Sequence, residues 1–206
     1  AYGNTTYVGV ADWQDLIYQN GFSQEYNISV SGGSDKGWHS FSGNFLTQEG
    51  IIKNSGFTRY SLRSNIGRYI NKWLEMGMNT SFTNTDTDFS KTNSSDCGVI
   101  RSALVFPTTY DPNKNKAETG ELSWLASNPL AYITNTKDNL SSINVFNSSY
   151  LEVKIFPFLK FRQNLGISYT DNKRGMYYGR ETQEGSSTTN INGKAEQSDN
   201  WWLGIT

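Results

Sequence analysis

Residues 56–86 read GFTRYSLRSNIGRYINKWLEMGMNTSFTNTD, and their pattern is the most informative in the chain. Apolar residues alternate with polar ones along two arms, about 57–70 and 73–85, which Asn71 and Lys72 join. A period of two indicates strands, because successive side chains of a strand point to opposite faces. We therefore expect one long β-hairpin that turns at Asn71 and Lys72.

The two arms are unusually long for strands of a soluble protein. Each keeps its alternation for about 13 residues, whereas soluble strands average about 5–6 and a tilted membrane-spanning strand needs about 9–11. One face of the hairpin is expected to carry Tyr60, Leu62, Ile66, Ile70, Leu74, Met76, Met78 and Phe82. The other face is expected to carry Phe57, Arg59, Ser61, Arg63, Asn65, Glu75, Gly77, Asn79, Ser81 and Thr83.

Similar alternation recurs along the rest of the chain. It predicts an all-β fold of about six antiparallel strands, with strand ranges of about 24–31, 38–48, 57–70, 73–85, 142–155, 159–171 and 199–206. Short connections (32–37, 71–72 and 156–158) alternate with longer ones (49–56, 86–141 and 172–198). Short helices are expected at 11–18, where Asp12 suits an N-cap, and in the long connection at 97–106 and 128–134.

Charged residues of the predicted strands concentrate on the polar parity: Glu25, Arg59, Arg63, Glu75, Glu152, Lys154, Lys160 and Arg162. Arg68 is the exception, and it lies close to the Asn71 turn. A lipid-facing strand face should lack charge, because Arg or Lys near the bilayer midplane costs about 2–4 kcal/mol. Alternating short turns and long loops also favour a transmembrane β-barrel. A soluble β-sandwich or a surface adhesin with one wet sheet face remains the alternative.

Composition excludes several classes of function. The net charge of -1, with no basic block, gives no sign of nucleic-acid binding. A single Cys97 and a single His39 are too few for a Cys- or His-based metal site. There is no run of 18 apolar residues, so no transmembrane helix is expected. No catalytic constellation is visible, and we predict neither enzyme activity nor a cofactor.

Some polar and aromatic residues invite a more specific interpretation. Asp86 and Asp88 lack the spacing and closing Glu of a calcium loop, so a solvated loop is favoured. Asp12 and Asp15 suit a helix cap better than acid–base work. Candidate sugar-stacking residues on the long connection are Tyr110, Trp124 and Tyr132, which could equally pin that connection to a barrel wall. Four aromatic residues suit an interfacial girdle: Tyr177, Tyr178, Trp201 and Trp202.

Several segments together resemble a known family. They are DWQD (12–15), YNISVSGG (26–33), QEGIIKNSGF (48–57), RYSLR (59–63), NKWL (71–74) and NPL (128–130). In this order and spacing, over roughly residues 11–206, the sequence is similar to the SusC/RagA-like TonB-dependent outer-membrane transporters of Bacteroidetes. The resemblance implies import of an oligosaccharide or peptide, a SusD-like surface lipoprotein as a lid, and energy from TonB through a segment absent here.

The resemblance also implies an orientation in the bacterial outer membrane. Residues 1–23 would end an extracellular loop, and residues 24–206 would form an early part of the barrel, without the plug and most strands. Arg59, Arg63 and Glu75 would face the lumen, and the apolar parity would face the lipid bilayer. The family's ligand contacts lie on extracellular loops and the plug, and no specific one can be matched to this sequence.

Overall fold

The computed structural model describes residues 10–91, 98–112, 128–180, 182, 185 and 193–206. The strands are β1 (Ser23–Ser34), β2 (Gly37–Glu49), β3 (Gly56–Tyr69), β4 (Leu74–Asp88), β5 (Thr136–Phe156), β6 (Leu159–Tyr178) and β7 (Lys194–Ile205). The helices are α1 (Trp13–Ile17), α2 (Val99–Val105) and α3 (Pro129–Thr134). The expected all-β fold is confirmed, with seven strands.

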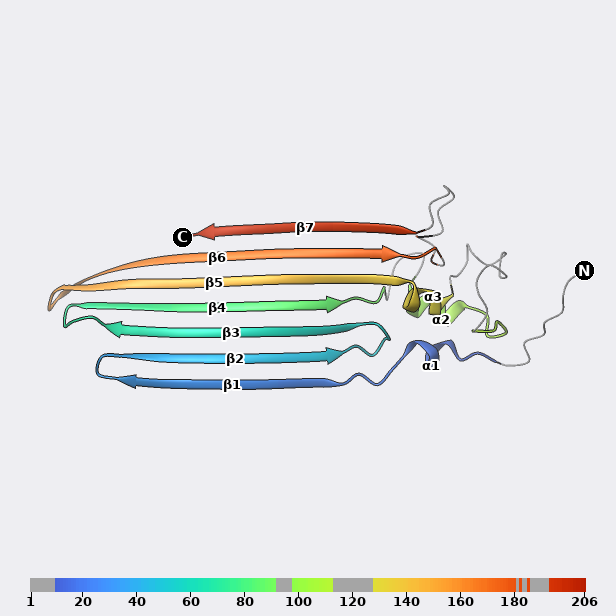
Figure 1. Cartoon of the computed structure of the whole chain (residues 1–206), viewed down its shortest axis with the longest axis horizontal. Coiled ribbons are helices and arrows are strands. Elements are labelled where there is room, and N and C mark those ends of the chain that lie inside the picture. The colour runs from blue at the N-terminus through green and yellow to red at the C-terminus, as the bar shows by residue number, and fades with distance from the viewer. Residues whose placement is uncertain (1–9, 92–97, 113–127, 181, 183–184, 186–192) are drawn as a thin grey trace, which may run out of the picture.

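The strands form one antiparallel sheet in which each strand pairs with its neighbours in the sequence. Figure 1 shows the short turns at one end of this sheet, and the helices and longer connections at the other. We call these the short-turn end and the long-loop end. The sheet does not close on itself, since β1 and β7 are its two edges. An open sheet of long strands fits a fragment of a larger barrel.

The opening hairpin pairs as the alternation predicts. Leu62 lies opposite Phe82 and Ile66 opposite Met78, whereas Arg63 lies opposite Ser81 on the other face. The turn is held by the Asn71 side chain, whose Oδ1 accepts hydrogen bonds from the backbone N–H groups of Trp73 (2.9 Å) and Leu74 (2.8 Å).

Two predicted connections are shorter in the structure than the sequence suggested. Strand β4 continues to Asp88 and β5 already begins at Thr136, so strand pairing occupies both ends of the predicted 86–141 connection. The 172–198 connection likewise loses residues to β6 and β7. These extensions are mostly polar, and the few large apolar residues in them, Leu140 in β5 and Met176, Tyr177 and Tyr178 in β6, do not alternate with polar ones. They pair because the hydrogen bonds of a β-ladder join backbones, whatever the side chains are.

Among the described residues, the compact apolar core lies beside the sheet. We call it the helical cluster: Ala11, Trp13, Ile17, Ile52, Val99, Ala103, Phe106, Tyr132 and Ile133, from α1, α2, α3 and the β2–β3 connection. Its members are buried, whereas most apolar side chains of the sheet are exposed. The sheet is a single layer, so its strands bury little against other described elements (Figure 1).

Candidate functional site: two faces of the sheet and the long-loop end

One face of the sheet carries an exposed apolar band, which we call the apolar face. The register aligns apolar residues from all seven strands on it: Tyr26, Ile28, Val30, Phe41, Phe45, Tyr60, Leu62, Ile66, Met76, Met78, Phe82, Val145, Leu151, Val153, Phe161, Leu165, Ile167, Tyr169, Leu203 and Ile205. Ile28 is 71% exposed and Leu62 is 60% exposed. In the described part of the chain, no helix or second sheet covers this band.

The size of the band matches a bilayer. On β6 the apolar stretch runs over residues 159–169, which agrees with the about 9–11 residues that a tilted spanning strand needs. Beyond it, Asp171 and Lys173 lie on the same face and form an ion pair of 3.5 Å. Charged residues therefore occur on this face of β6 only where the strand continues beyond the apolar band toward the long-loop end.

Aromatic side chains border the apolar band. At its long-loop side, Tyr26, Phe45 and Tyr60 stack across β1, β2 and β3, with ring centroids 6.2 and 4.9 Å apart. At the short-turn end the rings of Phe156 and Phe158 stack at 5.5 Å. Such rows are typical of the membrane–water interface, where the amphipathic rings prefer to lie.

The predicted girdle residues divide between the two faces. Tyr177 and Trp201 lie on the apolar face, because Trp201 is opposite Asp171 and Tyr177 shares that parity. Tyr178 and Trp202 lie on the other face. Neighbouring residues of one strand cannot share a face, so at most one of each pair can line a lipid interface.

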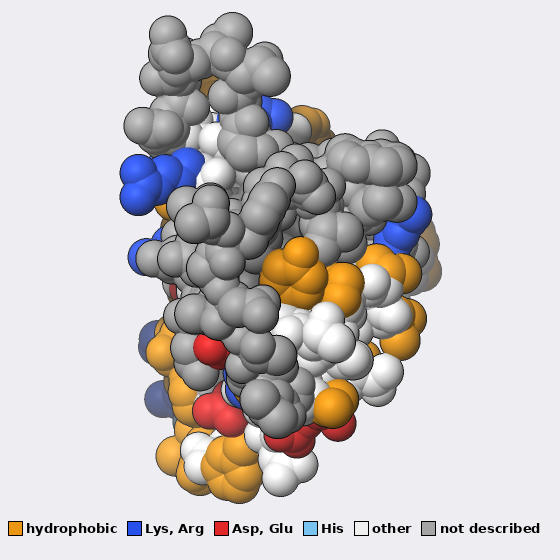
Figure 2. Space-filling model, turned by 90° about the vertical axis from the view of Figure 1, so that its right-hand side faces the viewer, with side chains coloured by type: hydrophobic (Ala, Val, Ile, Leu, Met, Phe, Trp, Pro, Cys, Tyr) orange, Lys and Arg blue, Asp and Glu red, His pale blue; other side chains and the backbone are white. Residues whose placement is uncertain are grey.

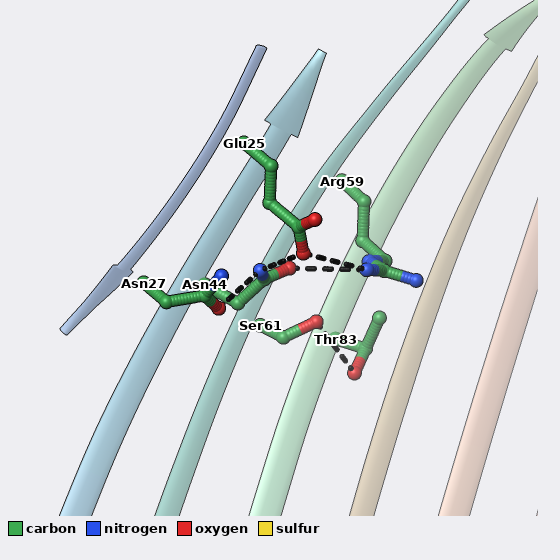
Figure 3. Close-up of polar contacts among 6 residues, drawn as sticks. All are labelled: Glu25, Asn27, Asn44, Arg59, Ser61 and Thr83. Carbon is green, nitrogen blue, oxygen red and sulfur yellow. Dashed lines mark hydrogen bonds and ion pairs between the residues drawn. The ribbon is translucent and has the colours of Figure 1, made fainter. Parts of the chain in front are cut away.

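The opposite face, which we call the polar face, is joined by hydrogen bonds across strands (Figure 3). Asn44 Nδ2 donates to Glu25 Oε1 (2.7 Å) and to Asn27 Oδ1 (2.6 Å). Arg59 Nη2 donates to Asn44 Oδ1 (3.1 Å) and lies 3.9 Å from Glu25 Oε1. Asn44 therefore bridges a carboxylate and a guanidinium, and β1, β2 and β3 share one polar network.

A second polar cluster lies on the same face toward the short-turn end. Tyr150 Oη donates to Glu75 Oε1 (2.8 Å), and the Arg162 guanidinium stacks 3.9 Å from the Tyr150 ring centre. Glu152 pairs with both Arg162 (3.7 Å) and Lys160 (3.3 Å). Charged groups on this face thus compensate one another, as expected of a surface in contact with water or with other polar groups.

Two glycines make room for aromatic rings in this region. Gly67 and Gly77 are paired across β3 and β4, and their outer neighbours in the register are Trp38 and Tyr150. A Cβ on Gly67 would collide with the Trp38 ring, and one on Gly77 with the Tyr150 ring. Each ring therefore covers the glycine of the adjacent strand, which packs this part of a single-layer sheet.

The helical cluster ties the long-loop end together. The Asp12 carboxylate caps α1 by accepting from the N–H groups of Gln14 (3.0 Å) and Asp15 (3.1 Å), as predicted. The Trp13 indole N–H donates to Pro107 O (3.1 Å), and its ring meets Phe106 edge-on at 5.0 Å. Figure 2 looks onto this end and shows hydrophobic and acidic side chains side by side on it.

The connection between β2 and β3 anchors the cluster to the sheet. Lys53 Nζ donates to Leu16 O (2.7 Å), and Asn54 Nδ2 donates to Ile133 O. The Gln19 side chain donates to Gly50 O (3.0 Å). Residues distant in sequence are thereby fixed as one unit above the strand ends.

The described candidate sugar-stacking residues, Tyr132 and Tyr110, differ in how far they are exposed. Tyr132 is 1% exposed, so protein covers both faces of its ring in this structure. Tyr110 packs against Phe106 at 5.4 Å on the edge of the cluster and keeps partial exposure. Trp124 lies outside the described residues, as does Cys97. The structure thus brings Tyr110 and Tyr132 to the same cluster at the long-loop end.

A polar hollow of about 430 Å³ opens beside the cluster, between the connections. Its lining includes Asn54, Asp88, Phe89, Thr136 and Asn139. At its margin, Arg174 makes a bidentate pair with Asp138, at 2.8 and 2.7 Å. Sequence reasoning missed this pair, because both residues fall in segments predicted as connections.

The described residues contain neither a cluster of metal ligands nor a membrane-spanning helix. Among them, no three His, Cys, Asp or Glu side chains are grouped to hold a metal ion. Within the same residues, no helix is long and apolar enough to span a membrane. Asp88 instead accepts a hydrogen bond from Asn139 Nδ2 (3.0 Å).

Comparison with known proteins identifies relatives of this chain. No family model matches it. It is 28% identical over 173 residues to TonB-dependent receptor P3 of Formosa agariphila, covering 81% of this chain and 17% of that protein. It is 26% identical over 90 residues to TonB-dependent receptor SusC of Bacteroides thetaiotaomicron, covering 43% of this chain and 9% of SusC. The chain thus spans less than a fifth of the length of these curated relatives.

A solved structure shows the same fold. The RagAB peptide transporter superposes with a TM-score of 0.71 and 19% identity, over 96% of this chain and 22% of that one. The expected resemblance is confirmed by these comparisons. All these relatives are receptors or transporters rather than enzymes, as the sequence predicted.

Proposed function

We propose that this chain, whose sequence and fold resemble a segment of SusC/RagA-like TonB-dependent receptors, forms part of the wall of a nutrient-importing outer-membrane barrel. The observation that carries the proposal is the exposed apolar band, to which all seven strands contribute and which is backed by a hydrogen-bonded polar face. An exposed apolar surface of this extent is unusual for a soluble protein and marks a membrane or protein contact. The apolar face would contact lipid, and the polar face would line the interior.

The orientation follows from the lengths of the connections. In outer-membrane barrels the short turns are periplasmic and the longer loops extracellular. We place the short-turn end in the periplasm and the helical cluster outside the cell. Residues 1–23 then end an extracellular loop that includes α1, and residues 24–206 are a partial barrel.

The open edges support a larger parent barrel. In the part of the chain that the structure describes, β1 and β7 are the edge strands, so one side of each has no strand to pair its backbone N–H and C=O groups. Each unsatisfied backbone group within hydrocarbon costs several kcal/mol, so spanning sheets must close. Further strands would satisfy these groups in the parent protein.

The proposal extends to the transported molecule and to the partner proteins. The family resemblance supports an oligosaccharide or a peptide as cargo, a SusD-like surface lipoprotein as a lid, and TonB as energy source. The RagAB neighbour is named a peptide transporter, and SusC is named a TonB-dependent receptor. Tyr110 and Trp124 are the candidate cargo contacts on the long loop, and Tyr132 would support them from within the cluster.

Site-directed labelling tests which face meets lipid. Single cysteines replace Leu62 and Met78 on the apolar face, or Arg63 and Asn79 on the polar face, in the intact parent protein with Cys97→Ser. A membrane-impermeant maleimide should label the second pair after permeabilisation and spare the first pair, which a lipid-soluble maleimide should label. Equal labelling of both pairs by the impermeant reagent would refute the membrane assignment.

Uptake measurements test the cargo. Cells lacking the gene should lose accumulation of either a labelled oligosaccharide or a labelled peptide, and the parent gene should restore it. The alternative, a surface adhesin or a soluble β-sandwich, predicts no transport defect. A sandwich would also need a second sheet over the apolar face, and none of the described elements provides one.

A further inference from the structure

Arg68 is a cation on the apolar face, at its short-turn edge. It lies opposite Met76 on β4 and Gly37 on β2, at the short-turn end of the apolar face. It is exposed, and in the described part of the chain no carboxylate forms an ion pair with it. An arginine facing lipid is tolerated near the interface, where its cost falls to about 0–1 kcal/mol.

Two lysines join Arg68 at the same edge. Lys36 and Lys72 sit in the β1–β2 and β3–β4 turns, and together with Arg68 they line a hollow of about 1000 Å³. The Tyr69 N–H donates to Lys36 O (3.0 Å), which ties the first turn to β3.

Carboxylates do not neutralise this group of cations. Neither lysine takes part in an ion pair among the described residues. Asp35 and Glu75 also line the hollow, but Glu75 is hydrogen bonded to Tyr150 on the polar face. Lys154 adds a further positive charge to the lining. The edge therefore has an excess of positive charge beside an apolar surface.

A second feature lies farther along the same face. A hollow of about 420 Å³ opens where Gly43, Ser64 and Thr80 are small, with bulky walls that include Ile28, Val30, Phe41, Leu62 and Phe82. Its walls are almost entirely apolar. A Cβ on Gly43 would be in van der Waals contact with Ile28 (3.4 Å) and Leu62 (3.5 Å), so even a small side chain here would take up space between these two walls of the hollow.

The separation of the two features matches one leaflet of a bilayer. Along β3 the step from Arg68 to Leu62 is 68 − 62 = 6 residues, or about 20 Å at about 3.3 Å per residue. A strand tilted by about 45° converts this into a depth of about 14 Å, and half of a hydrocarbon core of about 30 Å is about 15 Å. A phosphate at Arg68 would therefore place the end of its acyl chain at the Gly43 hollow.

We propose that the apolar face binds one anionic glycerophospholipid, with its phosphate at Arg68, Lys36 and Lys72 and one acyl chain in the hollow over Gly43. The site rests on the proposed membrane function, since it needs the short-turn end at a lipid interface. We infer a lipid rather than free phosphate as the ligand, because the cations lie next to an apolar surface that is long enough for an acyl chain. The headgroup supplies negative charge to a lining in which four cations outnumber two carboxylates, Asp35 and Glu75.

Native mass spectrometry of the intact parent barrel, released from nanodiscs of phosphatidylglycerol and phosphatidylcholine, tests the site. The wild type should retain phosphatidylglycerol preferentially. Each cation near an anionic surface contributes about fivefold in affinity. Arg68→Gln should therefore reduce retention about fivefold, and the triple variant with Lys36→Gln and Lys72→Gln about a hundredfold. Arg59→Gln, on the same strand but the polar face and outside both hollows, is the matched control and should change nothing.

Further variants test the cationic edge and the hollow over Gly43 separately, and they distinguish failure of the lipid site from failure of the proposed barrel function. Gly43→Leu should weaken retention of long-chain but not short-chain phosphatidylglycerol, and Arg68→Lys should retain the lipid if the triple variant does not fold. Equal retention by the Arg68→Gln and Arg59→Gln variants would overturn the inference. So would displacement of the lipid by millimolar inorganic phosphate. If the barrel inserts into the nanodisc but lipid retention is unchanged by Arg68→Gln or abolished by phosphate, the proposed function stands and only the lipid site fails.

Discussion

Replacing neighbouring residues of β4 by arginine gives a direct energetic test of the two faces. Met78 lies on the apolar face, opposite Ile66 and Ser149, between the Arg68–Met76 pair at the short-turn edge and the Leu62–Phe82 pair deeper in the band. Asn79 follows it on the polar face, opposite Asn65 and Ser148. Both side chains are exposed in the structure. Met78→Arg and Asn79→Arg therefore differ in the side of the sheet and in little else.

The expected difference is measurable. Arginine facing lipid in a barrel costs about 2–4 kcal/mol at the bilayer midplane and about 0–1 kcal/mol at the interface, whereas residues facing the interior are not exposed to lipid. Met78 lies between these depths, so Met78→Arg should cost about 1–2 kcal/mol, which at about 1.4 kcal/mol per tenfold change shifts the folding equilibrium by about 5- to 30-fold. Asn79→Arg replaces one polar group by another among polar neighbours and should remain within about 0.5 kcal/mol of wild type.

Urea titration of the intact parent protein in lipid vesicles measures both effects. The folded fraction is followed by the gel mobility difference between folded and unfolded barrels. Met78→Arg should unfold at clearly lower urea concentration, and Asn79→Arg should follow the wild-type curve. If the two variants are equally stable, or if Asn79→Arg is the weaker one, the assignment of the apolar face to lipid is wrong.

Three further predictions concern packing within the chain. Gly77→Val should destabilise the sheet by about 1–3 kcal/mol, because its side chain would collide with the Tyr150 ring, and the added Tyr150→Ala should recover part of the loss in a urea titration. Asp12→Ala should cost about 0.5–2 kcal/mol of local stability by removing the α1 cap, seen as faster amide exchange confined to residues 13–18; faster exchange throughout the sheet would contradict a local role. Trp13→Ala should cost about 3–5 kcal/mol in the helical cluster and admit proteolysis near α2, while the mobility shift of the folded barrel persists.

The helical cluster explains why α1, α2 and α3 form at all. None is longer than Val99–Val105, and helices this short are not stable in isolation. They are held by Trp13, Ile17 and Val99, which bury almost completely against one another. Their stability is therefore tertiary, and the N-terminal caps at Asp12 and Asn128 only fix where α1 and α3 begin.

The sequence alone determined the features that depend on local patterns. Alternation assigned Leu62 and Met78 to one face and Arg63 to the other, because a strand has a strict period of two. Asp12 marked the start of α1 through its capping chemistry, and Pro129 marked the start of α3 because proline suits the first helical position. The motif order indicated the relatives, as the comparisons confirmed.

Only the tertiary structure decided the features that depend on which strands meet, and in what register. The bridge by Asn44 between Glu25 and Arg59 arises from cross-strand pairing, which the sequence does not specify. Tyr132 became a buried residue because segments far apart in the chain converge on it. The polar ends of β5 and β6 are strands because backbone groups pair regardless of side chain. Periodicity reveals a face, whereas a site requires the register that brings faces from different strands together.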